Sequence, residues 1–178
     1  MAEIKSTIDL IMERTKGLTL SPEEKERLEE EKRVRGAQTL VQRYLRGELS
    51  PEELSRKRDE ITSNAQKAMM KALVEGIRLG REEFNRAMGA LERWGGKGNR
   101  VQLQRIRDLA HPFGQALQKR RRKVKAELWE DLARKGVQGS AVEPNVEGSD
   151  KWDETIEAVA QEFDPRLRQL RKDLLAQL

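Results

Sequence analysis

Cysteine is absent from this sequence of 178 residues, histidine occurs once, and aromatic residues make up only 4% of the chain. The absence of cysteine excludes disulfides, thiolate metal ligands and cysteine nucleophiles. Any catalysis by an imidazole would depend on His111 alone. That histidine precedes Pro112, and we interpret the pair as a structural corner between helical segments rather than as a catalytic base.

Motifs for metals and cofactors are also lacking. Helical di-iron proteins need repeated Glu-x-x-His pairs, whereas this chain has a single Asp108-x-x-His111. Residues 95–99 read Gly-Gly-Lys-Gly-Asn and could bind an anion through their amides, but they lack the Walker spacing and a preceding strand. We interpret them as an interhelical turn. We expect no enzymatic activity, no cofactor, no metal site and no small-molecule substrate.

Long hydrophobic runs are missing too. No run approaches the roughly 18 apolar residues that a membrane span needs. Residues 1–18 are amphipathic, with isoleucines at helical spacing, and their charges are of both signs, unlike those of a signal or transit peptide. We expect a packing helix there. Without cysteine or an export signal, the default location is a cytoplasm of bacterial type.

The residues that are abundant are those that build helices. Ala, Glu, Lys, Leu and Arg together fill more than half of the chain, and charged residues (38%) outnumber hydrophobic ones (36%). This composition is typical of long helices that each bury only an apolar stripe. We therefore predict an all-α fold. It would be a single elongated bundle over residues 1–178, with long, partly coiled-coil-like helices.

Two similar Ser-Pro-Glu-Glu motifs, beginning at Ser21 and Ser50, predict helix starts. In each, serine caps the helix, proline fits its first turn and the second glutamate closes a capping box. The first helix is expected to end near Arg46. Its initial part, residues 22–33, is almost entirely charged, which predicts a projecting helical arm. The second pattern runs from Pro51 to about Trp94.

The most apolar stretch, residues 65–80, contains four small residues spaced four apart: Ala68, Ala72, Gly76 and Gly80. Small residues at this spacing let another helix approach closely. The stretch is our predicted central helix, and its partner is either another helix of the same chain or a second copy in a homodimer seam. Because glycine destabilises helices, the two glycines could instead mark a bend.

Residues that would interrupt a helix are fewer in the second half of the chain. Asn99 is a candidate cap for a helix that reaches about Lys135, with a kink or corner at His111-Pro112. Residues 136–150 form a long connection without helical character. Residues 151–178 predict a last helix that is acidic at first and then rich in leucine, with a kink at Pro165.

Charge is distributed unevenly along the chain. Residues 97–136 carry a net charge of +8, and residues 137–178 carry −4. The centre of the basic segment runs from Lys119 to Lys125. If it is helical, Arg121 lies on the apolar side and needs a carboxylate, which we expect from the acidic last helix. Two interpretations stay open. Either the run is a solvated face that acids of the same chain neutralise, or its remaining cations, Lys119, Arg122, Lys123 and Lys125, bind the phosphates of nucleic acid or an anionic membrane surface.

The run Arg120–Leu128, the connection after it and the Leu-rich last helix together resemble the helical arm of ribosome recycling factor. That family inserts a β-rich domain between its first two long helices, where residues 18–96 are here predicted to be helical. We therefore transfer no functional residue, and the resemblance implies only a ribosomal or RNA partner.

Two hypotheses remain. The first is a non-enzymatic helical interaction or assembly protein, which forms a homo-oligomer or binds another helical protein. The alternative is a basic helical protein that binds RNA or the ribosome through residues 119–125.

Overall fold

The computed structural model describes residues 21–137, 139 and 142–177, and this part is all-α, without a strand. The predicted fold class is thereby confirmed. The amphipathic stretch within residues 1–18 lies outside the described residues. The elements are α2 (Pro22–Leu45), α3 (Pro51–Asp59), α4 (Ser63–Glu75), α5 (Glu82–Trp94), the short 3₁₀ helix η1 (Lys97–Asn99), α6 (Arg100–Arg134) and α7 (Asp150–Leu175).

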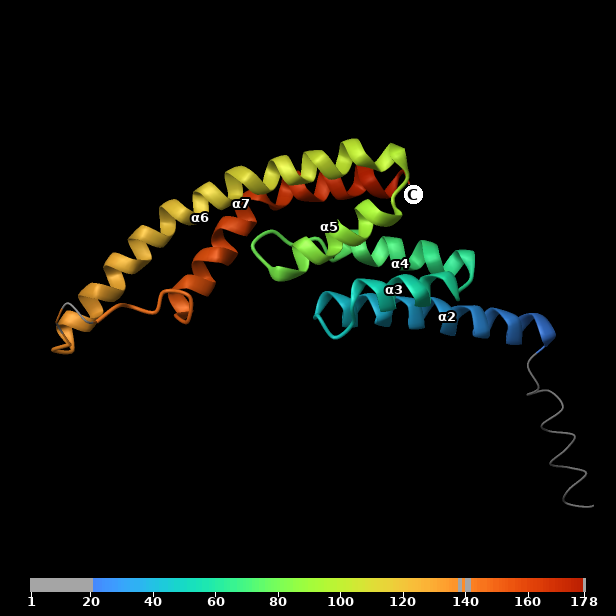
Figure 1. Ribbon diagram of the computed structural model, residues 1–178, viewed down its shortest axis with the longest axis horizontal. Helices are drawn as coiled ribbons and strands as arrows, with labels where there is room; N and C mark the ends of the chain where they lie inside the picture. Colours follow the sequence, from blue (N-terminus) through green and yellow to red (C-terminus); the bar gives the residue numbers. More distant parts are fainter. Residues whose placement is uncertain (1–20, 138, 140–141, 178) are drawn as a thin grey trace, which may run out of the picture.

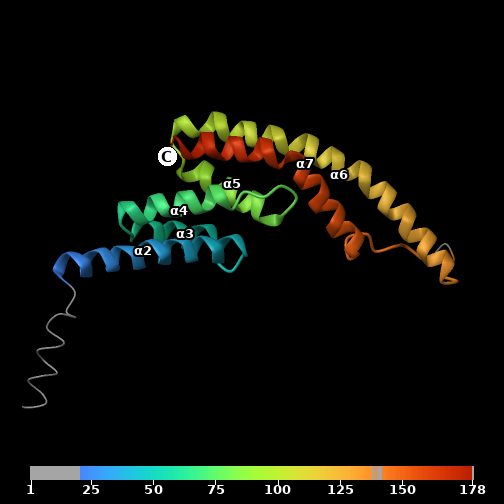
Figure 2. The same cartoon turned by 180° about the vertical axis from the view of Figure 1, so that it is seen from behind.

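The helices form a short bundle and a long hairpin (Figure 1). Helices α2 to α5 pack together, while α6 and α7 run antiparallel to each other over a much greater length. Contacts of α4 with α7 and of α5 with α6 hold the hairpin against the bundle. The view from behind shows the far part of the hairpin extending well beyond the bundle (Figure 2). We call this part, residues 117–155, the arm.

Local sequence determines where α2 and α3 begin. The Glu24 amide donates to Ser21 Oγ at 3.1 Å, and the Ser21 amide donates to the Glu24 carboxylate at 2.8 Å. The same reciprocal pair joins Ser50 and Glu53. Both helices begin at the proline after the capping serine. At the end of α2, Gly47 adopts a left-handed conformation with φ of 81°.

The charged residues 22–33 of α2 are exposed, with Glu30 alone half-buried. The first turns of this helix extend past α3 and α4 (Figure 1). Glu30 also contacts the bundle, because its carboxylate accepts a hydrogen bond of 2.9 Å from the Thr62 hydroxyl. The arm of the hairpin is a second projection, which the sequence analysis did not anticipate.

The expectation of one pattern running from Pro51 to Trp94 is wrong, because the structure divides it into α3, α4 and α5. The Thr62 hydroxyl accepts a hydrogen bond from the Ala65 amide and so starts α4 after a short turn. Gly76 caps the end of α4, and Gly80 has φ of 75°. Side-chain capping and a left-handed glycine therefore override helical periodicity here.

The core is centred on α4, as its apolar composition predicts. Met69, Leu73 and Val74 are completely buried, and so is Ile77 in the connection to α5. The core continues into α2, α5, α6 and α7 through residues such as Val41, Leu91, Ile106 and Leu174. One continuous cluster thus joins the bundle to the near part of the hairpin.

The small residues of the predicted seam pack within the chain. Ala72 is 6% exposed, and Ala68 is half-buried. A Cβ placed on Gly76 would lie 2.4 Å from Leu45 Cδ1, so the end of α2 already occupies that space. Gly80 lies against the Phe113 ring of α6. The sequence left open whether the small residues pack against helices of the same chain or against a second copy. Gly76 and Gly80 pack against residues of the same chain.

Neither proline in the hairpin ends its helix. α6 continues through Pro112 with only a gentle curve, so the corner predicted at His111-Pro112 is wrong (Figure 1). Burial on both sides of Pro112 explains this, since Leu109 and Phe113 are nearly inaccessible and the Phe113 ring meets Phe163 edge-on at 5.6 Å. α7 also remains one helix through Pro165, but it bends clearly part-way along its length (Figure 1). Tertiary packing offsets the roughly 3 kcal/mol that a helical proline costs.

Gly80 and Gly89 provide a matched test of this packing. Gly80→Ala should lower the free energy of unfolding by about 2–3 kcal/mol, because alanine resists the left-handed backbone and its Cβ would lie 2.8 Å from Phe113 Cζ. Gly89→Ala, in the exposed interior of α5 with nothing within 4 Å, should raise it by about 0.5–1 kcal/mol. Urea denaturation measures both. Equal effects of the two substitutions on the free energy of unfolding would contradict the described packing of Gly80, between α4 and α5, against Phe113.

Candidate nucleic-acid interface

The basic run Lys119–Lys125 lies on α6 at the base of the arm, and helical geometry distributes its six cations around the axis. Some of these side chains face α7 and the connection after α6, whereas others face solvent. The two groups differ in one respect that matters for function. The first group is neutralised by acidic residues of the same chain, and the second is not.

Three cations of the run make ion pairs. Arg121 Nε lies 2.9 Å from Glu147 Oε1, and Lys125 Nζ lies 2.7 Å from Glu143 Oε1. Arg120 pairs with Glu162 of α7. Two of the three carboxylates therefore come from the connection between α6 and α7, which folds back along α6.

The pKa values of the two connection carboxylates reflect this pairing. The hydrogen bond from Lys125 lowers the pKa of Glu143, and the hydrogen bond from Arg121 does the same for Glu147. All four side chains are at least 37% exposed. Exposed pairs stabilise a protein little, so these pairs chiefly orient the connection on α6.

The structure corrects one prediction about the run and adds a contact to another residue of it. The partner of Arg121 is not an acid of the last helix but Glu147 in the connection. Lys125, predicted to contact nucleic acid, is already engaged by Glu143. A sequence signal was available, because the two acids and their two partners have the same spacing of four residues in opposite order along the chain. That spacing fits a segment returning antiparallel to a helix.

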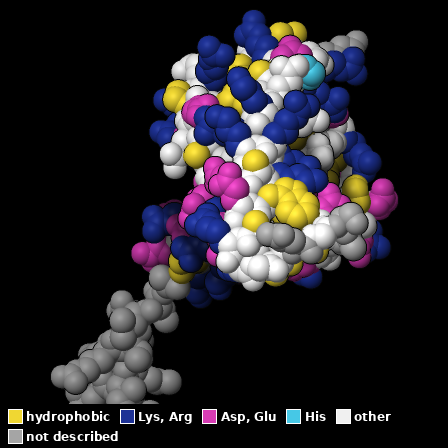
Figure 3. Space-filling model, turned by 90° about the vertical axis from the view of Figure 1, so that its left-hand side faces the viewer, with side chains coloured by type: hydrophobic (Ala, Val, Ile, Leu, Met, Phe, Trp, Pro, Cys, Tyr) yellow, Lys and Arg dark blue, Asp and Glu magenta, His cyan; other side chains and the backbone are white. Residues whose placement is uncertain are grey.

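Lys119, Arg122 and Lys123 form the unneutralised group, which we call the cationic triad. All three side chains are exposed, and none makes an ion pair with a residue in the described part of the chain. Viewed from the far end of the arm, Lys and Arg predominate over Asp and Glu on the side where α6 runs (Figure 3).

A groove of about 730 Å³ separates this part of α6 from the start of α7. Lys119 and Lys123 line one side of it, and Lys151 of α7 lines the other. Lys151 is paired, with its Nζ 2.8 Å from Asp131 Oδ2, and this contact lowers the pKa of Asp131 and raises that of Lys151. Two triad lysines are therefore the available cations of the groove.

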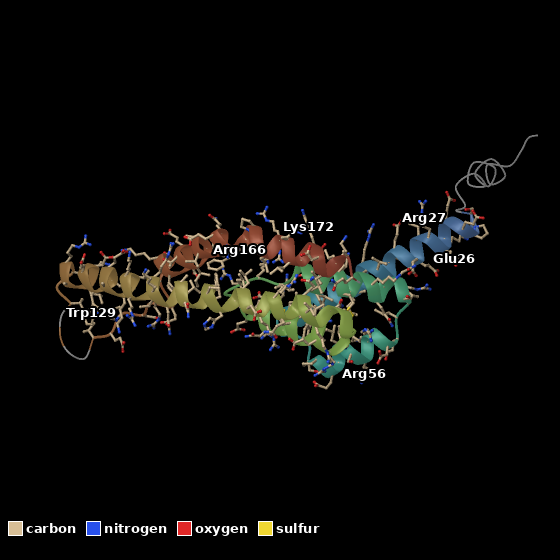
Figure 4. The ribbon with its side chains drawn as sticks, turned by 90° about the horizontal axis from the view of Figure 1, so that it is seen from above. Glu26, Arg27, Arg56, Trp129, Arg166 and Lys172 are labelled. Atoms are coloured by element: carbon tan, nitrogen blue, oxygen red, sulfur yellow. The ribbon has the colours of Figure 1, made fainter. Side chains whose placement is uncertain are left out.

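No aromatic side chain belongs to the basic run. Trp129, the next aromatic residue along α6, is half-buried near the far end of the arm (Figure 4). Base stacking on aromatic rings is what usually supports binding of single strands. The surface is therefore suited to phosphates, through an attraction that does not depend on base sequence.

The other candidate residues do not assemble into a site. His111 is exposed, and its Nε2 lies 3.0 Å from the Gln115 amide, whereas Asp108 accepts a hydrogen bond from Gln104. Residues 97–99 form η1, and the buried Asn99 precedes α6 without a side-chain cap. No group of three potential metal ligands occurs among the residues searched. Nor does any described helix have the length and apolarity to cross a bilayer.

Comparison with models of known protein families, with curated proteins and with solved structures finds no match for this chain. Functional inference therefore depends on the geometry of the chain's own residues.

The pairs of the connection should respond to acid. Because the folded state lowers the pKa of Glu143 and Glu147 below the ordinary 4.5, their contribution is complete above pH 4.5 and disappears as the pH falls through the lowered values. We expect the methyl NMR signals of Val146, which lies between them and is 1% exposed, to change over that range as the connection loses its alignment on α6.

The matched control carries Glu143→Gln and Glu147→Gln. In this variant the Val146 signals should no longer depend on pH in the acidic range. A transition of the same size in the variant would show that other groups hold the connection.

Proposed function

We propose that this protein is a non-enzymatic helical interaction protein and that the arm is its binding surface. The observation that carries the proposal is the division of the basic run. Arg120, Arg121 and Lys125 are paired with acids of the chain, while the neighbouring cationic triad is exposed and unpaired.

The geometry of the triad favours a polyanionic partner. Residues three and four apart share one face of a helix, so Lys119, Arg122 and Lys123 lie together within one turn. Side chains on α6 cannot scatter as they would in a loop, because α6 is one continuous helix that packs against α7. Three cations on a fixed face fit the phosphates of RNA, either free or in a ribosome, better than they fit a mixed protein surface.

The triad also limits how strongly binding should depend on salt. Each phosphate contact releases about one counterion, and the logarithm of the association constant falls by about 0.7 per contact for single strands and 0.9 for duplexes. With three unpaired cations the expected slope is about −2 to −3. The paired cations do not contribute unless they leave their carboxylates.

Reversing the triad should abolish RNA binding. The variant Lys119→Glu, Arg122→Glu, Lys123→Glu removes the phosphate contacts and adds repulsion, so we expect RNA to be lost from the purified protein and from filter-binding assays. The matched control reverses three exposed cations outside the arm that make no ion pair with a described residue: Lys25, Arg56 and Lys67. Both variants change the net charge equally, and circular dichroism checks that each is helical.

Retention of RNA should remain high in the control. Equal losses in the two variants would assign binding to overall charge and not to the arm. Wild-type protein that carries no RNA at low salt and binds none in the assay would contradict the polyanionic partner altogether.

Self-association is a second candidate, and an open apolar groove favours it. This groove of about 430 Å³ lies between α6 and α7 and includes Leu109, Pro112 and Leu170. Its rim has charges of both signs, Asp108 and Arg166 among them. In a two-fold dimer each copy would present the acid of one subunit to the arginine of the other.

Sedimentation equilibrium tests this candidate without interference from the elongated shape, which affects gel filtration. A dimer should have twice the monomer mass of 20.5 kDa at low and high salt alike, because apolar burial is not screened. Leu170→Glu should return it to the monomer mass. A single species of monomer mass at all protein concentrations would exclude self-association as the function.

A further inference from the structure

A separate cavity lies where the connection between α4 and α5 meets α7. Its volume is about 290 Å³, and its walls come from Arg78, Leu79 and Arg81 on one side and from α7 on the other. It is distinct from the groove of the cationic triad, which lies between α6 and the start of α7. No residue of the arm lines this cavity, so the function proposed for the arm does not account for the cavity.

The carboxylates around this cavity are already paired with other cations. Arg81 lies 3.6 Å from Glu157, and Arg168 Nε lies 2.6 Å from Asp164 Oδ2. The nearby Glu75 lies 3.9 Å from Lys71 on its own helix. Each of these acids therefore has a cationic partner, which for Glu157 is Arg81 of the cavity itself.

Two arginines of the cavity remain without such a partner. Neither Arg78 nor Arg171 makes an ion pair with any residue in the described ranges, and the Nε of Arg171 is buried without a hydrogen-bond acceptor. Burial lowers the pKa of Arg171, the charge of Asp164 opposes this shift, and the positive charges of Arg78 and Arg168 add to it. A buried N–H without an acceptor is unfavourable. No described carboxylate forms an ion pair with either guanidinium group, so both are available to an anion in the cavity.

The remaining wall is apolar. Leu79 is 5% exposed and Leu167 is 4% exposed, and Ala160 is half-buried between them and solvent. Two guanidinium groups beside such a surface suit a ligand with an oxyanion at one end and a small apolar body at the other. The volume is at the lower end of the range for ligand pockets, so the ligand must be small.

We propose that this cavity binds a small organic oxyanion of the phosphate-monoester type, whose oxygens accept hydrogen bonds from Arg78 and Arg171. Guanidinium groups recognise phosphate and carboxylate oxygens through paired N–H donors. Because its walls belong to the α4–α5 connection and to α7, the bound anion would join the bundle to the hairpin. Binding should then raise the melting temperature of the whole chain.

Calorimetric titration of the full-length chain with four probes tests the proposal: inorganic phosphate, phenyl phosphate, benzoate and neutral benzyl alcohol. We expect saturable binding of phenyl phosphate that is tighter than that of inorganic phosphate, and no binding of benzyl alcohol. Benzoate that binds as tightly as phenyl phosphate would support the same oxyanion chemistry and identify carboxylates as ligands.

Variants then locate the site. Arg171→Gln and Arg78→Gln should each weaken the binding of phenyl phosphate about tenfold or more. Ala160→Leu should weaken it by filling the cavity with no change of charge. The matched control is Lys172→Gln, which removes one positive charge from an exposed position next to Arg171 on α7 and should leave binding unchanged (Figure 4).

Three results would overturn the proposal. They are the absence of saturable binding by both phosphate probes, an equal loss in the Lys172→Gln control, and equal binding of benzyl alcohol. Arg78 is exposed, so its substitution provides the test even if Arg171→Gln fails to fold. The triad-reversal variant should bind phenyl phosphate normally, which separates this site from the RNA surface.

Discussion

α6 and α7 contact each other through one narrow apolar stripe, and the arm, the groove and the second cavity all depend on this contact. Ile106 and Phe113 on α6 and Val159, Leu167 and Leu174 on α7 are nearly inaccessible to solvent. A chain with only 36% hydrophobic residues has no second layer to replace them. The stripe also explains why Pro112 does not break α6, since apolar side chains on both sides of the proline are held by the same neighbours.

The parts of the fold that were predictable are those that depend on adjacent residues. Serine, proline and glutamate within four positions determine the start of α2 and of α3, and no distant residue is needed. The break between α3 and α4 was missed because Thr62 is a weaker signal than a Ser-Pro pair. The opposite error occurred at Pro112, where a strong local preference was overridden by burial that the sequence does not display.

The sequence predicted the charge of the candidate surface but not the pairing of its residues. Charge can be counted along a chain, so the basic segment and the acidic segment after it were predictable. Pairing requires the path of the connection, and this is why the partner of Arg121 was assigned incorrectly and the pairing of Lys125 with Glu143 was missed. The second cavity could not have been found, because Arg78 and Arg171 are far apart in sequence and are brought together only when α7 packs on the bundle.

Apolar burial holds the connection between α6 and α7 on the hairpin, and ion pairs align it along α6. Pro144 and Val146 are buried, and the contacts they make are insensitive to ionic strength. The glutamates that alternate with them are exposed, and dissolved ions screen their attraction to α6 over about 10 Å at 0.1 M. Rising salt concentration should therefore first disturb the alignment of this segment along α6, and only at higher concentration release the segment from the hairpin. A polyanion that displaced Glu143 and Glu147 would likewise leave the connection in place while adding Arg121 and Lys125 to the three cations of the triad.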